Sequence, residues 1–175
     1  MWCHVKISQA LKTCVAYLFD ITPDELEGGD KDKVIEREEC VARGVTPRRV
    51  MQWFGTEVMQ HALMADILPH VGRHFWIDRA VADIKRMIAC GHNVVISDVR
   101  FTHELDALAR AFSDQLLTLY IERATKSSTT TEDAHESEAG VDELKARAIT
   151  VVNTDGDIPG LLRKCESIIR TAHTA

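Results

Sequence analysis

The hydrophobic positions along the chain follow helical spacing in some stretches and form short continuous runs in others. Apolar residues three or four apart predict helices over residues 9–19, 47–58, 76–89, 102–112 and 161–169. Short apolar runs predict strands over residues 94–97, 116–121 and 149–153, with a very short one over residues 4–7. Strands that alternate with helices indicate a parallel, doubly wound α/β sheet covered on both faces.

Local signals set the expected starts and stops of these helices. Thr46 is placed as an N-cap with Pro47 at the first helical position, and Gly91 ends the helix over residues 76–89. The sequence TPDE at residues 22–25 predicts another helix start. Residues 27–43 are dense in charge and contain Gly28-Gly29, so we expect a solvated excursion that contributes little core. Residues 127–138 are polar and predict a loop.

The composition is that of one soluble globular domain. Of the 175 residues, 45% are hydrophobic and 27% charged, and no apolar run approaches the ~20 residues of a membrane span. The first residues have no signal-peptide character, so we expect a cytoplasmic protein. A net charge of -6 disfavours a nucleic-acid surface. The five cysteines are scattered without a C-x-x-C pair, which favours reduced thiols.

The strand over residues 94–97, which we expect to be buried, ends in Asp98 and Arg100. Ligands of open α/β sheets bind beyond the carboxyl ends of the strands. An Asp there can hold Mg²⁺ or its waters, and an Arg two residues later can bind phosphate oxygens bidentately. Alternatively, Asp98 caps the next helix and Arg100 pairs with Glu104 or Asp106. The spacing leaves both interpretations open.

Arg48 and Arg49 favour the phosphate interpretation. Both lie in the first turn of a predicted helix, where the helix dipole makes cations unfavourable. Two arginines at this position therefore suggest that they bind an anion. For Arg49 alone, extension into solvent is the simpler account. Trp53 and Trp76 could stack on a base, although core packing is the commoner role of tryptophan.

Other candidate sites are weaker. His70 and His74 have metal-ligand spacing, but Gly72 interrupts them and no general-base Glu lies between them. Residues 133–138 are better interpreted as an exposed acidic loop than as a metal cluster. No Ser-His-Asp or Cys-His arrangement can be assembled. None of the nine glycines lies in a G-x-x-x-x-G-K-[ST] loop, the usual cradle for nucleotide phosphates.

Several segments together resemble the phage and viral deoxynucleoside monophosphate kinases, which are P-loop phosphotransferases of α/β fold. These segments are TPRRVMQWFGTE (46–57), FW (75–76), VVISDVRF (94–101) with Glu104, HESE (135–138) and NTDG (153–156). In order, the resemblance covers residues 10–169. The collinear order is more specific than any single motif.

The resemblance implies a three-layer, parallel-sheet P-loop kinase-like fold in a single domain over residues 1–175. It would contain an acceptor-binding helical insertion at about residues 22–90 and a lid-like segment at about 123–148. The implied reaction transfers the γ-phosphoryl group of ATP, with Mg²⁺, to a deoxynucleoside monophosphate. The implied partner is that nucleotide, with no nucleic-acid surface and no membrane, and a homodimer is left open.

The resemblance also implies roles for individual residues. Arg48 would hold the acceptor phosphate, and Arg100 would contact phosphate. Asp98 would serve Mg²⁺, directly or through water, and Arg123 would be a lid arginine near the transferring group. The remaining substrate-binding set would comprise Trp76, Glu104, His135, Ser137 and Glu138.

The chain departs from the family in two respects. Family members carry an Arg shortly after Gly-Thr-Glu, where this sequence reads Val58-Met59-Gln60. The family's first strand, P-loop and first helix precede the segment that matches residues 8–19. We therefore expect a sheet without its first, central strand, leaving unpaired amides between the strands at residues 94 and 116. The ATP phosphates would also lack their backbone cradle.

Three explanations are open. The chain is a fragment of a larger kinase or the product of a mis-called or decayed gene; or it is a non-catalytic homologue or partner subunit that binds nucleotide; or it uses another strand and another phosphate site. A truncated or inactive nucleotide-binding homologue is therefore the alternative to a working kinase. A purely structural protein would be indifferent to nucleotides when Arg48, Asp98 or Arg100 is replaced.

Overall fold

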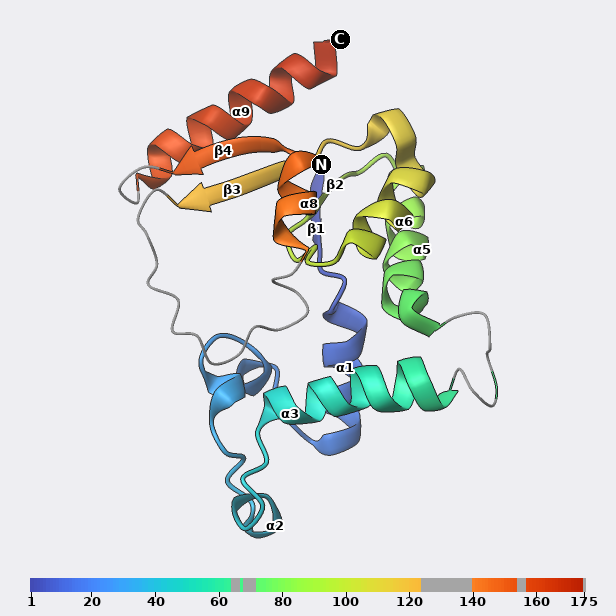
Figure 1. Ribbon diagram of the computed structural model, residues 1–175, viewed down its shortest axis with the longest axis vertical. Helices are drawn as coiled ribbons and strands as arrows, with labels where there is room; N and C mark the ends of the chain where they lie inside the picture. Colours follow the sequence, from blue (N-terminus) through green and yellow to red (C-terminus); the bar gives the residue numbers. More distant parts are fainter. Residues whose placement is uncertain (64–66, 68–71, 124–139, 154–156, 175) are drawn as a thin grey trace. The chain divides into compact units, whose positions relative to one another are not determined.

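The computed structural model describes residues 1–63, 67, 72–123, 140–153 and 157–174. The chain divides into two compact units, unit 1 (Met1–Val99) and unit 2 (Arg100–Ala175), and each is described by itself. Each unit contains a pair of parallel strands with helices packed against it (Figure 1). The α/β class is therefore confirmed, whereas a single domain over the whole chain stays a prediction.

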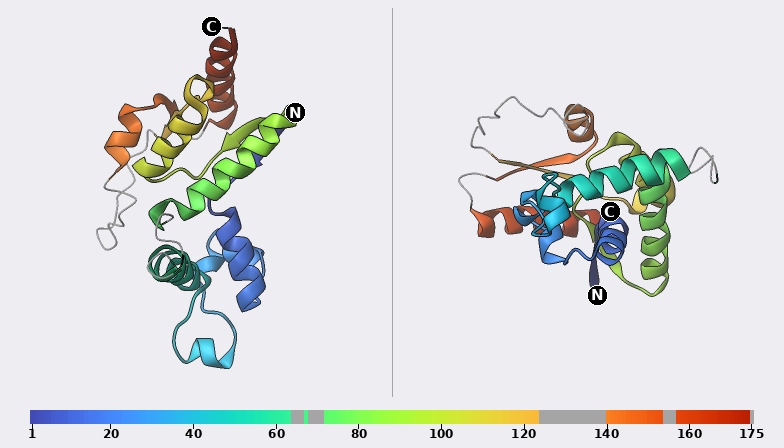
Figure 2. Two further views of the ribbon diagram at one scale, coloured as in Figure 1. Left: turned by 90° about the vertical axis from the view of Figure 1, so that its right-hand side faces the viewer. Right: turned by 90° about the horizontal axis from the view of Figure 1, so that it is seen from below.

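The strand pair of unit 1 joins segments that are far apart in the sequence. β1 (Trp2–Val5) pairs in parallel with β2 (Asn93–Ile96), with Trp2 opposite Asn93 and Val5 opposite Ile96. Helix α5 (Phe75–Ala89) packs against both strands (Figure 2). Because the strands are parallel, the loop after β1 and the loop after β2 leave the sheet at the same edge.

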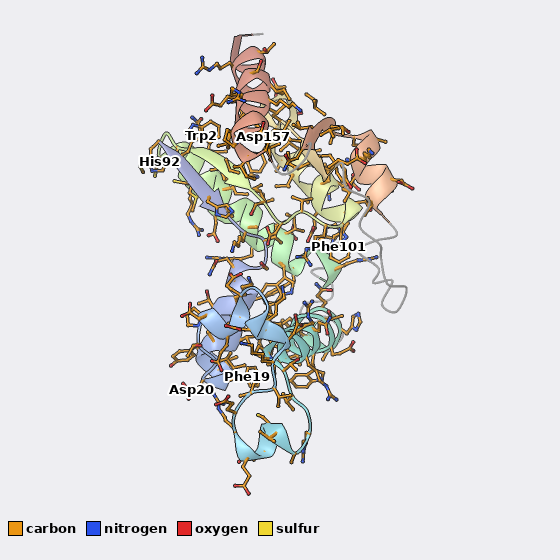
Figure 3. The ribbon with its side chains drawn as sticks, turned by 90° about the vertical axis from the view of Figure 1, so that its left-hand side faces the viewer. Trp2, Phe19, Asp20, His92, Phe101 and Asp157 are labelled. Atoms are coloured by element: carbon orange, nitrogen blue, oxygen red, sulfur yellow. The ribbon has the colours of Figure 1, made fainter. Side chains whose placement is uncertain are left out.

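The expectation that the strand before Asp98 is buried is wrong on one face. Val95 is 46% exposed and Trp2, on the neighbouring strand, is 52% exposed. Successive side chains of a strand point to opposite faces, and α5 packs on this two-stranded sheet. Within unit 1, the described helix that packs on β1 and β2 is α5. Figure 3 labels Trp2 in β1 and His92 just before β2.

Helix α1 (Gln9–Phe19) has the predicted bounds, and one side of it forms a core. Val15 is fully buried, and Leu11 and Phe19 pack against the same cluster, whereas Leu18 of the predicted apolar stripe is exposed. The helix ends at Asp20, whose φ of 50° is left-handed (Figure 3). The apolar stripe is therefore narrower than the sequence suggests.

The predicted helix start at residues 22–25 is present but leads to a single 3₁₀ turn, η1 (Asp24–Leu26). The Thr22 hydroxyl donates to Glu25 Oε2 at 2.6 Å, and the Thr22 amide donates to the same oxygen at 2.8 Å. These bonds lower the pKa of the Glu25 carboxyl. The local capping signal is thus satisfied without a long helix following it.

Residues 27–43 contribute more core than predicted. They contain η2 (Asp30–Asp32) and the short helix α2 (Glu38–Val41). Ile35 is only 5% exposed and packs in one cluster with Val15, Ile21 and Leu26. The Ile35 amide donates to the Val45 carbonyl at 3.0 Å, which turns the segment back toward the cluster.

Helix α3 (Pro47–Gln52) starts as predicted and continues as a wider helix. Thr46 Oγ1 accepts from the Arg49 amide at 3.2 Å, and Pro47 is the first helical residue. From Trp53 the segment η3 (Trp53–Ala62) is a π-helix, a rare form. The Gly55 carbonyl accepts from Trp76 Nε1 at 3.1 Å, which ties this segment toward α5, preceded by η4 (Gly72–His74).

Unit 2 begins with α6 (Thr102–Phe112), whose bounds are those predicted, followed by η5 (Ser113–Gln115). β3 (Leu119–Arg123) pairs in parallel with β4 (Ile149–Asn153), so that Arg123 lies opposite Asn153. Between them lies α8 (Val141–Ala146), which the sequence pattern did not predict. Helix α9 (Ile158–Thr174) packs on β4, as Figure 1 shows.

The described residues form one strand pair in each unit, β1 with β2 in unit 1 and β3 with β4 in unit 2. Among the described residues, none of the helices has the length and apolar character needed to cross a membrane.

We expect Gly55→Ala to destabilise unit 1. A Cβ at Gly55 would lie 3.0 Å from Leu11 Cδ2 and 3.3 Å from Leu11 Cδ1, so the packing of η3 against α1 must shift. Overpacking of this kind costs about 1–3 kcal/mol, which outweighs the gain of replacing glycine in a helix. Urea unfolding of the purified chain measures the change in the free energy of unfolding.

Two variants make this prediction specific. Gly29 has an ordinary φ of -79° and open space around it, so Gly29→Ala should be neutral or slightly stabilising. In a Leu11→Ala background the clash is gone, and Gly55→Ala should no longer destabilise. Equal destabilisation by Gly55→Ala in both backgrounds would show that the contact with Leu11 is not the cause.

Candidate functional site

Asp98 follows β2 and binds the start of α1. Its Oδ1 accepts from the Ile7 amide at 2.8 Å, and its Oδ2 accepts from the Ser8 amide at 3.1 Å and the Ser8 hydroxyl at 2.7 Å. The carboxylate thereby joins the carboxyl ends of β1 and β2 and fixes the point where α1 begins. The alternative that Asp98 caps the helix that follows it, over residues 102–112, is wrong, because its hydrogen-bond partners Ile7 and Ser8 lie at the start of α1 instead.

A role of Asp98 toward Mg²⁺ stays a prediction, because one carboxylate together with waters and phosphate oxygens can hold that ion. Both carboxylate oxygens already accept hydrogen bonds, and one of them accepts two. No group of three His, Cys, Asp or Glu side chains in the described part of the chain is placed to hold a metal ion. Asp98 therefore has the contacts of a residue that positions a loop and a helix.

Arg48 holds a carboxylate in its guanidinium fork. Nε donates to Asp32 Oδ1, and Nη2 donates to Asp32 Oδ2 at 3.1 Å. Arg48 lowers the pKa of Asp32, and Asp32 in turn raises the pKa of Arg48. The Arg48 side chain is 44% exposed, so the fork is reachable from solvent. Arg49, its neighbour, donates from Nη1 to the Arg43 carbonyl at 3.4 Å.

Two lysines that the sequence analysis did not single out share one carboxylate. Glu27 Oε1 accepts from Lys12 Nζ at 2.7 Å and from Lys6 Nζ at 3.1 Å. These two hydrogen bonds lower the pKa of Glu27, with that to Lys12 the larger cause. Lys6 follows β1 and Lys12 lies in α1, so no local pattern in the sequence brings the three residues together.

Trp76 has the contacts of a core residue. It is 8% exposed, its Nε1 donates to Gly55, and its ring meets Phe75 edge to face at 4.8 Å between centroids. Trp53 is by contrast exposed. A role of Trp76 in substrate binding stays a prediction.

In unit 2, Glu104 caps α6 and fixes the backbone of Arg100. Glu104 Oε2 accepts from the Arg100 amide at 2.8 Å and from the Phe101 amide at 3.0 Å. Glu104 is buried, and Phe101, labelled in Figure 3, stacks on His103. The contact between Arg100 and Glu104 is therefore made through the backbone, and the Arg100 side chain is exposed.

The predicted site residues fall into both units. Unit 1 contains Arg48, Trp76 and Asp98, and in the described part of the chain each contacts residues other than these three. Unit 2 contains Arg100, Glu104 and Arg123, the last of which ends β3. Residues 133–138, which include His135, Ser137 and Glu138, lie outside the described residues, as does His70.

A small cavity of about 270 Å³ lies at the start of α9 in unit 2. Figure 3 labels Asp157 at this position. Asn153, the last residue of β4, lines it and is 8% exposed, and its Oδ1 has no hydrogen-bond partner among the described residues. A buried acceptor without a donor is costly, so this oxygen is suited to accept from a bound N–H or O–H group. The other lining residues are Gly160, Leu161, Arg163 and Lys164.

We expect Asp98→Asn to lower the free energy of unfolding by about 1–3 kcal/mol, because one oxygen cannot replace two in accepting three hydrogen bonds. Urea unfolding followed by circular dichroism measures the loss. Asp114→Asn, at an exposed position in η5, is the matched control and should change little. An equal, small effect of both substitutions would contradict the positioning role of Asp98.

The contact of Glu27 with the two lysines predicts a pH dependence of stability. The folded-state pKa of Glu27 lies below its unfolded value of about 4.3, so the contact stabilises the fold above that pH. Its contribution is lost as the pH falls through the folded pKa. The stability difference between the natural chain and Glu27→Gln should therefore shrink between about pH 5 and pH 3. Glu36→Gln, at an exposed site, should show no such change, and a difference that stays constant with pH would contradict the prediction.

Comparisons with known proteins assign the chain to a family. The model of the family described as deoxynucleotide monophosphate kinase matches residues 11–165. A protein of Acanthamoeba polyphaga mimivirus, provisionally named a deoxynucleotide monophosphate kinase, is 28% identical over 148 residues, which cover 82% of this chain and 70% of that protein. No solved structure matches the chain significantly. Because the family match extends over most of the sequence, the chain belongs to the deoxynucleotide monophosphate kinase family.

Proposed function

We propose that this chain binds a deoxynucleoside monophosphate through Arg48 and transfers the γ-phosphoryl group of ATP to it. Family membership supports the reaction class. The observation that carries the acceptor site is the fork of Arg48, which is partly exposed and already holds a carboxylate by two hydrogen bonds. A phosphate presents oxygens to a guanidinium in the same bidentate way.

The proposal gives the remaining predicted residues distinct tasks. Arg100 contacts phosphate with its exposed side chain, and Glu104 supports it by holding its backbone amide. Arg123 approaches the migrating group, and His135, Ser137 and Glu138 belong to the lid. Trp76 serves the acceptor subsite. Asp98 serves Mg²⁺, directly or through water, and its carboxylate also holds the start of α1 beside the strand ends. An oxygen of the acceptor phosphate attacks the γ-phosphorus, and the bond to ADP breaks.

The proposal includes the three-layer, P-loop kinase-like fold that the resemblance implies. Its support is the two parallel strand pairs of the described residues, each with helices packed against it. ATP enters the reaction with Mg²⁺, as in other phosphoryl transfers. A second candidate function is nucleotide binding without transfer. It is favoured by one observation, that the sequence contains no G-x-x-x-x-G-K-[ST] loop.

The test separates acceptor binding from phosphoryl transfer. Calorimetry measures binding of dAMP, dGMP, dCMP and dTMP, and a coupled assay measures ADP formation with MgATP and each nucleotide. We expect binding of at least one of them, and Arg48→Ala should weaken it about tenfold or more, because a charge-assisted bidentate contact is lost. Arg49→Ala is the matched control, since Arg49 lies in the same helical turn and pairs with no carboxylate in the described part of the chain.

The outcomes assign the function. Binding that depends on Arg48, together with ADP formation, supports the kinase. The same binding without ADP formation supports the binding-only candidate. Equal affinities of the natural chain and Arg48→Ala would contradict the acceptor site.

A further inference from the structure

We propose that two carboxylates of the segment over residues 27–32, Glu27 and Asp32, compete with the acceptor phosphate for Lys6, Lys12 and Arg48. This inference rests on the proposed function and deepens it in two ways. It adds Lys6 and Lys12 to the phosphate-binding surface of unit 1. It also makes Glu27 and Asp32 residues that set the affinity for the nucleotide.

The first argument is that every cation of this set is held by the same short segment. Asp32 occupies the fork of Arg48 with both of its oxygens. Glu27 occupies both lysines with a single oxygen. A phosphate is the other ligand that could satisfy a guanidinium fork and an ammonium group in these positions, because it offers oxygens of the same kind and more negative charge.

The second argument is the balance of charge. One carboxylate at Glu27 faces two ammonium groups, so this pairing carries a net positive charge that a nucleotide phosphate can neutralise further. Lys12 is the more buried of the two lysines, with a side chain 16% exposed. A lysine held in this way has lost part of its hydration, so it gains from an additional anion close by.

The third argument is the placement of the cations on elements that pack together. Lys12 lies in α1 and Arg48 in α3, and these helices are in contact, as are α3 and η2, which contains Asp32. The two glycines between Glu27 and η2, Gly28 and Gly29, have open space on the side where a side chain would lie. A Cβ at Gly28 or Gly29 would meet nothing within 4 Å, and Gly28 has a left-handed φ of +53°. The segment can therefore move away without disrupting packing at these two positions.

The ion pairs that Glu27 and Asp32 form with the three cations are weak enough for a phosphate to replace the carboxylates. Glu27 and Asp32 are each half exposed, and exposed ion pairs contribute little to stability. A doubly charged phosphate that reaches the same cations can therefore displace the carboxylates. The competition lowers the affinity for the nucleotide by a modest factor and does not abolish binding.

Calorimetric titration of the full chain with the four deoxynucleoside monophosphates tests this proposal. Asp32→Asn and Glu27→Gln each keep the shape of the side chain and remove its charge, and each should lower the Kd by about two- to fivefold. Lys12→Met keeps the buried aliphatic stem and should raise the Kd several-fold. Asp30→Asn is the matched control, because Asp30 lies in the same segment but pairs with Lys33 at 2.6 Å, and it should leave the Kd unchanged.

A double-mutant comparison identifies the route of the effect. If Asp32 competes for Arg48, Asp32→Asn should have no effect on the Kd in an Arg48→Ala background. An effect that persists there would be a general consequence of reduced negative charge and would overturn the proposal. Titration with the deoxynucleosides, which lack phosphate, should show no difference among the Asp32, Glu27 and Asp30 variants.

Failure of this inference differs from failure of the proposed function. If Arg48→Ala weakens binding while Asp32→Asn and Glu27→Gln leave the Kd unchanged or raise it, the competition is overturned and the acceptor site remains. If neither the natural chain nor any folded variant binds a nucleotide, both are overturned.

Discussion

The carboxylate of Asp98 is the interaction on which unit 1 depends. It joins the end of β2 to Ile7 and Ser8, which lie 91 and 90 positions earlier in the sequence. The contact lies where the two parallel strands end. Parallel strands leave their hydrogen-bonded ladder in the same direction, so the segments after β1 and β2 start side by side, and a hydrogen bond between them holds them together. Asp98 makes that connection and fixes the residue at which α1 begins. The contacts of α1 with α3, and hence the surroundings of Lys12 and Arg48, follow from this origin.

Elements specified by neighbouring residues were predictable from the sequence. The bounds of α1, α6 and β4 match the apolar spacing, and the N-cap at Thr46 is present. Elements that depend on distant residues were not. The exposed face of β2 depends on what packs over a sheet, and the burial of Ile35 depends on a return to Val45. The widened helix after Trp53 follows no local rule at all.

The candidate site shows the same division. Arg48 could be found, because two arginines at a helix start are locally unfavourable and because the surrounding motif resembles a family. Its partner Asp32 could not, since the short helix α2 and the loops on either side of it separate them. For Glu104 the sequence suggested an ion pair with Arg100, whereas the carboxylate binds the amide of that residue. The spacing was informative, but it could not distinguish a side chain from a backbone group.

The π-helical segment from Trp53 to Ala62 has a consequence for how the family can vary in length. In such a helix each amide bonds to the carbonyl five residues earlier, where an α-helix uses four. Removing one residue from this segment would convert it to the tighter form without exposing unpaired backbone groups. Within unit 1, η3 is therefore a place where a relative can lose a single residue and still keep Arg48 on α3 and Trp76 on α5.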